Sequence, residues 1–265
     1  MEAWMGLREP NGASGWPGLR PLEPLRSKVA SLLFSRLRRL PLHIGIIPDG
    51  NRRWARRRGL KPWLGHVAGY VRLRRILDKL WELGVRYVTV YAMSFENCLR
   101  RPMDERRFLY ALFSKALDDL VADRRVSGGL VRVRVVGELS MVPASLREKI
   151  RWVEEQTSGN GPHRLSIGLC YSGRWELLEA VKNILARGCK GVSEEELRRS
   201  LALGDLPEPD LIVRTGGEIR VSNFMLWHIA YSELYFTRTL WPDFDDLELA
   251  RALLDYQSRE RRFGA

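Results

Sequence analysis

Short apolar runs alternate along this chain with longer segments whose apolar residues recur at helical spacing. Ile44 to Ile47 is the first run, and similar runs occupy residues 86–92, 130–136, 163–171, 210–213 and 233–236. Runs of this length and composition are typical of buried strands. The predicted helices span residues 66–83, 103–125, 143–157, 173–187 and 245–262, with one more that begins after Ser193. Strands that alternate with helices predict an α/β fold with a mainly parallel sheet.

The N-terminal part of the chain has a different pattern. Residues 1–24 are rich in Gly and Pro and lack periodicity, which predicts a disordered leader. Residues 25–42 then predict a basic amphipathic helix, with leucines at helical spacing among lysine and arginine. Such a helix can lie on an anionic membrane surface or pack on its own domain or a partner. No apolar run is long enough to span a bilayer. Residues 43–265 are expected to form one domain.

Three of the predicted strands run directly into polar segments. Asp49-Gly50-Asn51 and several arginines follow the first, Ser94–Asn97 follows the second, and Arg214–Glu218 follows the fifth. Ligands of open α/β sheets bind just beyond the carboxyl ends of strands. If the three strands are neighbours, the three segments form one site.

The residue types in these segments suit a phosphorylated ligand. Guanidinium groups match phosphate oxygens, and Gly216-Gly217 lets the backbone approach a ligand closely. Asp49 and Glu233 would supply oxygen ligands for Mg²⁺. Simpler alternatives stay open: a solvated basic helix after Asn51, a surface or capping role for His66, and a structural ion pair for Glu233. The sequence contains no P-loop and no dinucleotide-binding glycine motif.

Composition limits the choice of partner and compartment. The 265-residue chain has a formal net charge of +12 and a pI near 10.0, which favours an anionic partner. Nucleic acid is one such partner, but charge alone supports it and no nucleic-acid-binding motif is present. The cysteines, Cys98, Cys170 and Cys189, are far apart and form no CxxC pair. They predict reduced thiols in a cytoplasmic protein.

Several longer motifs resemble those of one enzyme family. The motifs are Asp49–Ala55, Gly65-His66, Ser94–Asn97, Arg214–Glu218, and Arg220–Trp227 followed by Glu233–Phe236. In this order and spacing they resemble the cis-prenyltransferases, the family of undecaprenyl and dehydrodolichyl diphosphate synthases. The resemblance runs from about His43 to the C-terminus, and we expect an archaeal-type member.

The resemblance implies a fold, an activity and partners. The fold would be a single α/β domain with a six-stranded, mostly parallel sheet flanked by helices. The enzyme would add isopentenyl diphosphate repeatedly, in cis (Z) configuration, to an allylic diphosphate, for which geranylgeranyl diphosphate is a candidate. The product would be a long polyprenyl diphosphate, the precursor of a glycosyl carrier lipid. A homodimer, Mg²⁺ and peripheral contact with the membrane are implied as well.

The same motifs imply roles for individual residues. Asp49 and Asn97 would be catalytic, Asn97 in proton removal. Asp49 would bind Mg²⁺ together with Glu233, which would come from the partner side of the dimer. The implied substrate-binding residues are Gly50, Asn51, Arg52, Arg53, Trp54, His66, Ser94, Phe95, Glu96, Cys98, Arg100, Arg101, Arg214, Arg220, Val221 and Ser222.

The chain also departs from the family pattern. Cys98 replaces the usual tryptophan, and an inserted residue leaves both Arg100 and Arg101 as candidates for the family arginine. Ile219 stands where histidine is frequent, Pro62 where some relatives have a substrate-binding arginine, and Cys170-Tyr171-Ser172-Gly173 differs from the usual Tyr-Gly-Gly. We expect the product tunnel between the apolar face of residues 103–125 and the strands at 131–136 and 165–170.

The motifs argue against a trans-prenyltransferase and against a non-catalytic partner subunit. A trans-prenyltransferase needs two DDxxD motifs, but Asp118-Asp119 is followed by Ala122 at the last position. A non-catalytic partner subunit would lack the strand-end aspartate or the arginine motif, whereas Asp49 and Arg220-Val221-Ser222 are present.

Overall fold

A computed structural model describes residues 23–188 and 191–259, so residues 1–22 of the expected leader at 1–24 lie outside the described part. One sheet of six strands has the order β3-β4-β2-β1-β5-β6. All five neighbouring pairs are parallel, so the predicted α/β class is confirmed and "mostly parallel" becomes wholly parallel. The strands are β1 His43–Ile47, β2 Tyr87–Ser94, β3 Val131–Val136, β4 His163–Tyr171, β5 Leu211–Arg214 and β6 Glu233–Phe236.

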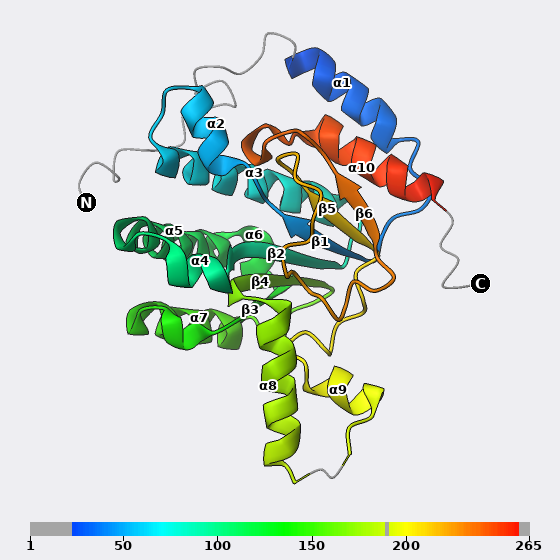
Figure 1. Ribbon diagram of the computed structural model, residues 1–265. Helices are drawn as coiled ribbons and strands as arrows, with labels where there is room; N and C mark the ends of the chain where they lie inside the picture. The colour runs from blue at the N-terminus through cyan, green and yellow to red at the C-terminus, as the bar shows by residue number, and fades with distance from the viewer. Residues whose placement is uncertain (1–22, 189–190, 260–265) are drawn as a thin grey trace.

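Helices connect the first five strands, as the hydrophobic pattern predicts, and a loop joins β5 to β6 (Figure 1). The five helices predicted with both bounds (66–83, 103–125, 143–157, 173–187 and 245–262) are observed within a few residues of those bounds, whereas α2, α4 and α6 had no predicted bounds. The α-helices are α1 Glu23–Phe34, α2 Asn51–Arg57, α3 Pro62–Glu82, α4 Phe95–Arg100, α5 Met103–Ala122, α6 Arg124–Ser127, α7 Ala144–Gln156, α8 Gly173–Ala186, α9 Glu194–Ser200 and α10 Asp246–Ser258. None of the described helices is long and apolar enough to cross a membrane.

The two faces of the sheet are buried by different parts of the chain. Alternate strand residues such as Ile46 and Val90 form one core with side chains of α3, α5, α7 and α10. Ile47 and Ile212 point to the other face, where Phe224 and neighbouring loop residues cover them. Burial on both faces explains why the strands read as continuous apolar runs.

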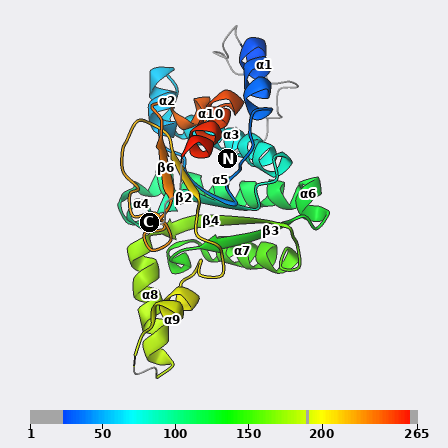
Figure 2. The ribbon, with the colours of Figure 1, turned by 90° about the vertical axis from the view of Figure 1, so that its right-hand side faces the viewer.

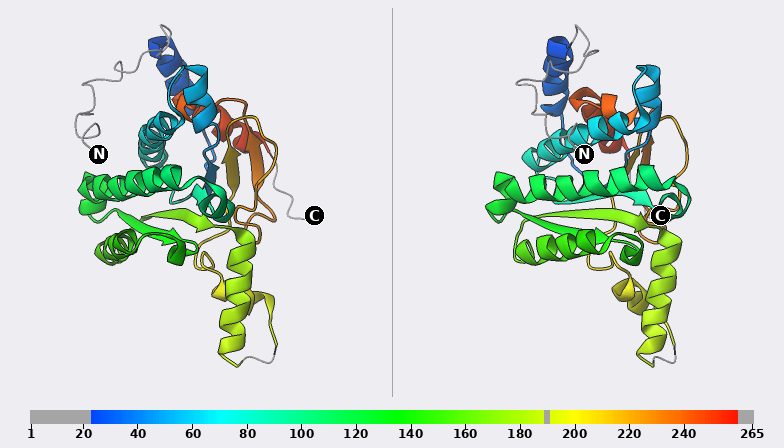
Figure 3. Two further views of the ribbon diagram at one scale, coloured as in Figure 1. Left: turned by 60° about the vertical axis from the view of Figure 1, so that its left-hand side comes forward. Right: turned by 90° about the vertical axis from the view of Figure 1, so that its left-hand side faces the viewer.

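One edge of the sheet is closed by a helix. The outer strand β3 donates the backbone N–H of Val135 to Glu154 Oε1 at 2.7 Å and that of Val133 to Thr157 Oγ1 at 3.1 Å. Glu154 belongs to α7 and Thr157 is its C-cap, so α7 lies along β3 (Figure 3). The unpaired donors of this edge are therefore satisfied within the chain.

The N-terminal helix differs from its prediction. It was expected over residues 25–42, but α1 begins at Glu23 and ends at Phe34. The following residues leave the helix because Leu37 and Leu40 pack against the main core. The helix rests on α10, with Arg26 Nε 2.7 Å from Asp245 Oδ2 (Figure 2). Packing on its own domain is thus confirmed, and membrane contact stays a prediction.

Candidate active site

The strand order brings the three polar segments together. β1 lies between β2 and β5 in a parallel sheet, so the carboxyl ends of all three strands meet at one edge. The register pairs Ile47, the last residue of β1, with Arg214, the last residue of β5. The sequence predicted one site only if the three strands are neighbours. The strand order shows that they are, so the three polar segments lie at the same edge of the sheet.

Asp49 lies at the centre of this edge, held by two arginines. Its Oδ2 accepts from Arg214 Nη2 at 2.9 Å and its Oδ1 from Arg53 Nη2 at 3.2 Å. Arg214 is only 4% exposed. Thr215 fixes the backbone of Asp49, because its hydroxyl donates to the Asp49 carbonyl at 2.7 Å and accepts from the Asp49 N–H at 2.9 Å. The carboxylate is thus preorganised by one charge at the end of β5 and one on α2.

Glycine at position 216 is required by this packing. Gly216 has φ +87°, a conformation that L-residues rarely adopt. A Cβ there would lie 2.6 Å from Arg53 Nη2 and 3.0 Å from the Asp49 carbonyl oxygen. The backbone of the β5 loop therefore approaches the site as the Gly216-Gly217 pattern suggested.

A polar cavity of about 300 Å³ opens beside Asp49. The Nε atoms of Arg52 and Arg101, two of its lining residues, are buried without a hydrogen-bond partner among the described residues, as is the acceptor Asn51 Oδ1. Buried donors are rarely left unpaired, so donors clustered around a cavity point to an anionic ligand. The cavity is lined by Pro48, Asp49, Gly50, Asn51, Arg52, Arg53, Arg56, His66 and Arg101.

Arg101, not Arg100, is the arginine of this cavity. Arg101 Nη1 donates to Glu105 Oε1 at 2.5 Å and lies 3.5 Å from His66 Nε2, whereas Arg100 is exposed on the outside of α4. Burial, followed by the charges of Arg101 and Arg52, lowers the pKa of His66 to about 3. His66 is therefore a neutral cavity residue rather than a surface residue.

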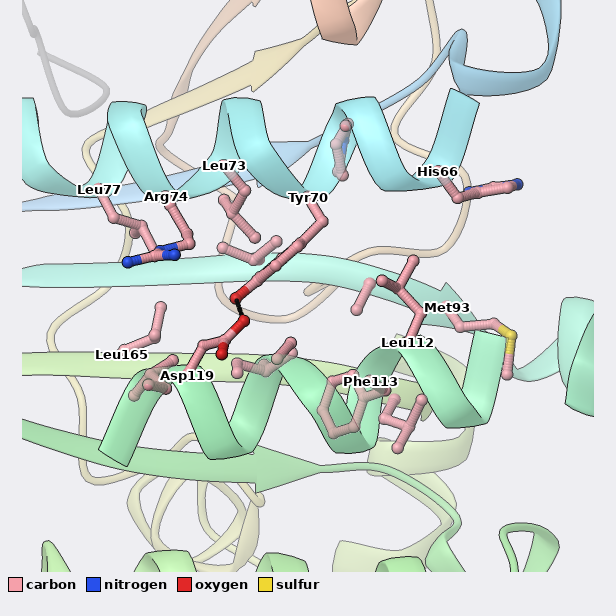
Figure 4. A pocket seen from close by; sticks show the side chains of 18 of the residues that line it. His66, Tyr70, Leu73, Arg74, Leu77, Met93, Leu112, Phe113, Asp119 and Leu165 are labelled. Atoms are coloured by element: carbon pink, nitrogen blue, oxygen red, sulfur yellow. Dashed lines mark hydrogen bonds between the residues drawn. The ribbon is translucent and has the colours of Figure 1, made fainter. Parts of the chain in front are cut away.

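A second, mainly apolar cavity of about 160 Å³ adjoins the first and shares Pro48, Asn51 and His66 with it. It runs between α3 and α5 over β2 and β4 (Figure 4). The expectation of a tunnel along α5 and β4 agrees with this cavity, but β3 supplies no lining residue. Residues of α3 such as Leu73 and Leu77 do so instead. In the sequence these residues appear only as the apolar face of a helix. The sequence does not show that this face of α3 lies opposite α5.

Comparison with known proteins places this geometry in a family. Residues 47–264 match the sequence model of the family described as "Putative undecaprenyl diphosphate synthase". An isoprenyl transferase of Neisseria gonorrhoeae is 45% identical over 225 residues, 85% of this chain and 90% of that protein. A geranylgeranyl-diphosphate-specific tritrans,polycis-undecaprenyl-diphosphate synthase of Thermoplasma acidophilum is also 45% identical, over 84% of this chain and 89% of that protein. The chain belongs to the undecaprenyl diphosphate synthase, or cis-prenyltransferase, family.

A solved structure supports the same conclusion. Lavandulyl diphosphate synthase from Lavandula x intermedia, crystallised with dimethylallyl diphosphate, superposes with a TM-score of 0.79 at 31% identity. The match covers 85% of this chain and 99% of that one. The resemblance drawn from the motifs is thereby confirmed, and the chain is a prenyltransferase.

The second polar segment of this cis-prenyltransferase forms a helix that the sequence did not predict. Ser94 caps α4 by accepting from the Asn97 N–H at 3.1 Å, and the helix also carries Phe95 and Glu96. Glu96 Oε1 accepts from Asn223 Nδ2 at 3.1 Å, which links α4 to the loop after β5. Ser94 is a capping residue, a role that a serine before Glu96 and Asn97 could have indicated.

Cys98 is in a disulfide bond, and this corrects two predictions. Cys98 of α4 is bonded to Cys170 of β4, 72 residues away, and both are fully buried. The prediction of reduced thiols is therefore wrong for this pair, and a buried disulfide is not available for substrate contact. The long separation hid the pairing, because only the β2–β4 neighbourhood brings the Cα atoms within 5.5 Å. Cys98 and Cys170 both depart from the family pattern, and they are bonded to each other.

Trp54, one of the predicted substrate-binding residues, is buried inside the protein. It is buried in a small cluster with Ala55 and Leu240, and its Nε1 donates to Asp243 Oδ1 at 2.8 Å. The guanidinium of Arg58 lies 4.2 Å from the ring centroid on the outer side. Trp54 is not among the residues that line the described cavity, and it anchors α2. Its contact with substrate stays a prediction.

The third segment is only partly assembled around Asp49. Ser222 Oγ accepts from Arg214 Nη1 at 2.6 Å, so this hydroxyl is tied to the site. Arg220 is exposed and pairs with Glu218 at 2.7 Å, and Val221 is half-buried beside it. Their backbone nevertheless belongs to the site, since Arg214 Nη1 also donates to the Arg220 carbonyl at 2.5 Å.

Asp49 and Glu233 are not brought together within one chain. Glu233 begins β6 and pairs with Leu211, at the end of the sheet opposite Asp49. Its Oε2 accepts from Arg259 Nη1 at 2.9 Å. Among the described residues no group of three or more His, Cys, Asp or Glu side chains could hold a metal. Mg²⁺ commonly uses one or two carboxylates plus substrate phosphates, and Asp49 beside the anion cavity fits that donor set.

Proposed function

We propose that this enzyme condenses isopentenyl diphosphate repeatedly onto an allylic diphosphate and forms Z double bonds. The observation that carries the proposal is the junction of a cationic cavity with an apolar one at Pro48, Asn51 and His66. A prenyl diphosphate has a dianionic or trianionic head and an apolar tail, which match the two cavities in charge and polarity. The complete Asp49–Arg214 pair argues against a non-catalytic partner subunit.

Each residue has a role set by its position. In each cycle the allylic C–O bond breaks, a C–C bond forms to the terminal carbon of isopentenyl diphosphate, and one proton leaves. Arg52, Arg53, Arg101 and the backbone after Gly50 would stabilise the charge that develops on the leaving diphosphate. Arg214, Ser222 and Arg220 would hold isopentenyl diphosphate. Mg²⁺, held by Asp49 and phosphate oxygens, would supply further charge neutralisation.

Asn97 is proposed to direct the departing proton. An amide is not a base, so Asn97 can orient the proton's path but cannot retain it. A phosphate oxygen is the acceptor of suitable basicity in this site. Phe95 and Glu96 lie on the same short helix and would contact substrate from that side.

The primer is proposed from the archaeal relatives. The relative from Thermoplasma acidophilum is named as geranylgeranyl-diphosphate specific. We therefore propose geranylgeranyl diphosphate as the primer and an undecaprenyl-type diphosphate as the product. Such a product would serve as the precursor of a glycosyl carrier lipid.

We also propose that the enzyme works as a homodimer. Leu178, Val181 and Leu185 form an exposed apolar stripe on α8, which projects from the body with α9 (Figures 1 and 2). Ile219 and Tyr231, in the loop between β5 and β6, are exposed as well. Exposed apolar patches mark interaction sites. In a dimer formed on this side, Glu233 of one chain would lie near Asp49 of its partner. Within a single chain the two residues are far apart.

The function is tested with purified enzyme, labelled isopentenyl diphosphate and MgCl₂. Geranylgeranyl, farnesyl and dimethylallyl diphosphate are compared as primers, and product length and double-bond geometry are measured by chromatography and NMR. We expect Z-polyprenyl diphosphates, with geranylgeranyl diphosphate giving the highest kcat/KM. Absence of elongation from every primer, or E double bonds in the product, would contradict the proposal.

A further inference from the structure

The loop that joins β5 to β6 contacts the helix that follows β2. Asn223 Nδ2 in this loop donates to Glu96 Oε1 of α4 at 3.1 Å. β1 lies between β2 and β5 in the sheet, so the hydrogen bond connects two segments that a strand separates. Ser222, proposed to hold isopentenyl diphosphate, precedes Asn223, and Asn97, proposed to direct the proton, follows Glu96. The hydrogen bond therefore joins two parts of the site through residues adjacent in sequence.

The side chain of Asn223 uses both ends of its amide. While Nδ2 donates to α4, Oδ1 accepts from the Arg174 N–H at 3.0 Å, and the Asn223 carbonyl oxygen accepts from the Gly173 N–H at 2.7 Å. Gly173 and Arg174 begin α8, which follows β4. A carboxylate at position 223 could replace the acceptor but not the donor. An amide is thus the side chain that can tie this loop to α8 and α4 together.

The backbone of the loop is held in a conformation that L-residues rarely adopt. Ser222, Asn223 and Met225 have φ values of +49°, +64° and +48°. Phe224, between them, is fully buried and stacks on Tyr91 with the ring centroids 4.7 Å apart. The Tyr91 hydroxyl also donates to the Ser222 carbonyl at 3.3 Å. Such conformations persist where the surroundings hold them, and they cluster at functional sites.

Glu96 is an ionised acceptor for this bond. Burial would raise the pKa of Glu96, but hydrogen bonds from its own backbone N–H, from Asn223 and from Ser94 outweigh burial and lower the pKa. The carboxylate is therefore charged at neutral pH. Hydrogen bonds to a charged acceptor are stronger and more directional than neutral ones. The bond can therefore hold the loop to α4 rather than merely accompany their contact.

We propose that Asn223 is a positioning residue that holds the Ser222 loop to α4 through Glu96 and so fixes isopentenyl diphosphate relative to the path of the departing proton. The proposal rests on the proposed function. The new C–C bond and the departing proton belong to the same isopentenyl unit, so both contacts must be aligned at once. A misplacement of about 1 Å between them is enough to slow such a reaction strongly. Without the bond, the loop and α4 move independently.

Four variants test the bond. Asn223→Asp tolerates the left-handed φ and still accepts from α8, but it cannot donate to Glu96. Asn223→Gly tolerates φ +64° and removes the amide without adding charge. In Glu96→Gln/Asn223→Asp the glutamine amide can donate to the aspartate, which restores the bond with its direction reversed. Gln156→Glu is the matched control for an amide-to-carboxylate change, because Gln156 is exposed at the end of α7. Circular dichroism and thermal unfolding check that each variant is folded.

The first readout is the separate change in kcat and in each KM. For Asn223→Asp and Asn223→Gly we expect the KM for isopentenyl diphosphate to rise about tenfold and kcat to fall. The KM for the primer should not change, because no residue that lines the cationic cavity belongs to the loop. A variant that only lowered the folded fraction would lower kcat and leave both KM values unchanged.

The double variant provides the rescue. Its kcat/KM for isopentenyl diphosphate should exceed that of Asn223→Asp by about tenfold, and Gln156→Glu should match the parent. An unchanged KM for isopentenyl diphosphate in Asn223→Asp, or a double variant no better than Asn223→Asp, would overturn the positioning role.

The second readout needs neither turnover nor substrate. Hydrogen–deuterium exchange is measured by mass spectrometry on peptides that cover residues 94–101 and 218–227. We expect both peptides to exchange faster in Asn223→Asp than in the parent and to return toward parental rates in the double variant. Unchanged exchange in folded Asn223→Asp would overturn the role. If the parent elongates no primer, the proposed function fails, whereas the exchange rates still decide whether Asn223 holds the two segments together.

Discussion

Arg214 donates Nη2 to Asp49 Oδ2 at 2.9 Å and thereby joins the carboxyl ends of β5 and β1. The guanidinium is almost fully buried, and its other terminal nitrogen donates to Ser222 Oγ at 2.6 Å. One side chain thus links the strand-end aspartate to Ser222, in the segment that follows the glycine loop. Charge-assisted contacts of this kind are short and directional, so the site is organised before any substrate binds.

Replacing Arg214 with Lys should disable the site without removing its charge. A lysine has no planar fork and cannot contact Asp49 and Ser222 together. Losing one or two charge-assisted hydrogen bonds should lower kcat/KM by roughly 10- to 100-fold. Steady-state kinetics with isopentenyl diphosphate as the varied substrate measures the change. Arg57→Lys, at an exposed position of α2, is the control, and wild-type kinetics in Arg214→Lys would argue against the assigned role.

A pair of glycine variants separates backbone strain from crowding of the site. Both Gly216 and Gly217 have positive φ, so alanine at either position should cost about 1 kcal/mol of stability. Only at Gly216 would the new Cβ meet Arg53 and Asp49; at Gly217 the nearest atom is 3.7 Å away. Gly216→Ala should therefore lose far more activity than Gly217→Ala at similar stability. Urea unfolding and kcat/KM are measured on both variants. Equal losses of kcat/KM would show that crowding at Gly216 does not matter.

The stability of the enzyme should fall as the pH drops below about 6.5, through His43. Burial lowers the pKa of His43 to about 4, while its Nδ1 donates to the Pro207 carbonyl at 2.6 Å. The unfolded chain then binds a proton that the folded chain does not, so this contribution is complete above pH 6.5 and is lost as the pH approaches 4. From pH 8 to pH 5 the loss should be about 2 kcal/mol.

The measurement is urea unfolding of the parent and His43→Gln at both pH values. Glutamine can hydrogen-bond but does not titrate, so the variant should lose less stability than the parent over this interval. Carboxylates elsewhere affect both proteins alike. Parallel losses in parent and variant would show that His43 does not titrate as described.

The disulfide predicts a thiol count and a stability change. The chain has three cysteines, so the denatured, unreduced protein should react with one equivalent of alkylating agent and the reduced protein with three. The Cys98→Ala/Cys170→Ala double variant should lose about 2–4 kcal/mol of unfolding free energy, because the bond closes a long loop in the unfolded chain. Mass spectrometry and urea unfolding provide the two readouts. Three reactive thiols before reduction would disprove the bond.

Much of this structure could be predicted from sequence because local patterns determine it. Buried strands such as Ile44–Ile47 and Val131–Val136 read as apolar runs, and Gly84 marks the end of α3. The site segments were found because each follows a strand, but only the strand order shows that they meet. Relations across the fold were missed: the Cys98–Cys170 bond, the inward turn of Trp54, and the pairing of α3 with α5 around the tunnel. Each depends on which elements are neighbours, and residue spacing does not encode that.

The central claim is that Asp49 and its surrounding cations form a Mg²⁺-dependent site for prenyl transfer. Incorporation of labelled isopentenyl diphosphate into polyprenyl product, with geranylgeranyl diphosphate as primer, tests it in the parent and in Asp49→Ala. The account predicts robust incorporation by the parent with MgCl₂, its abolition by EDTA, and a loss of about 10³-fold or more in folded Asp49→Ala. Incorporation that is unaffected by EDTA, or that persists at parental rates in Asp49→Ala, would contradict it.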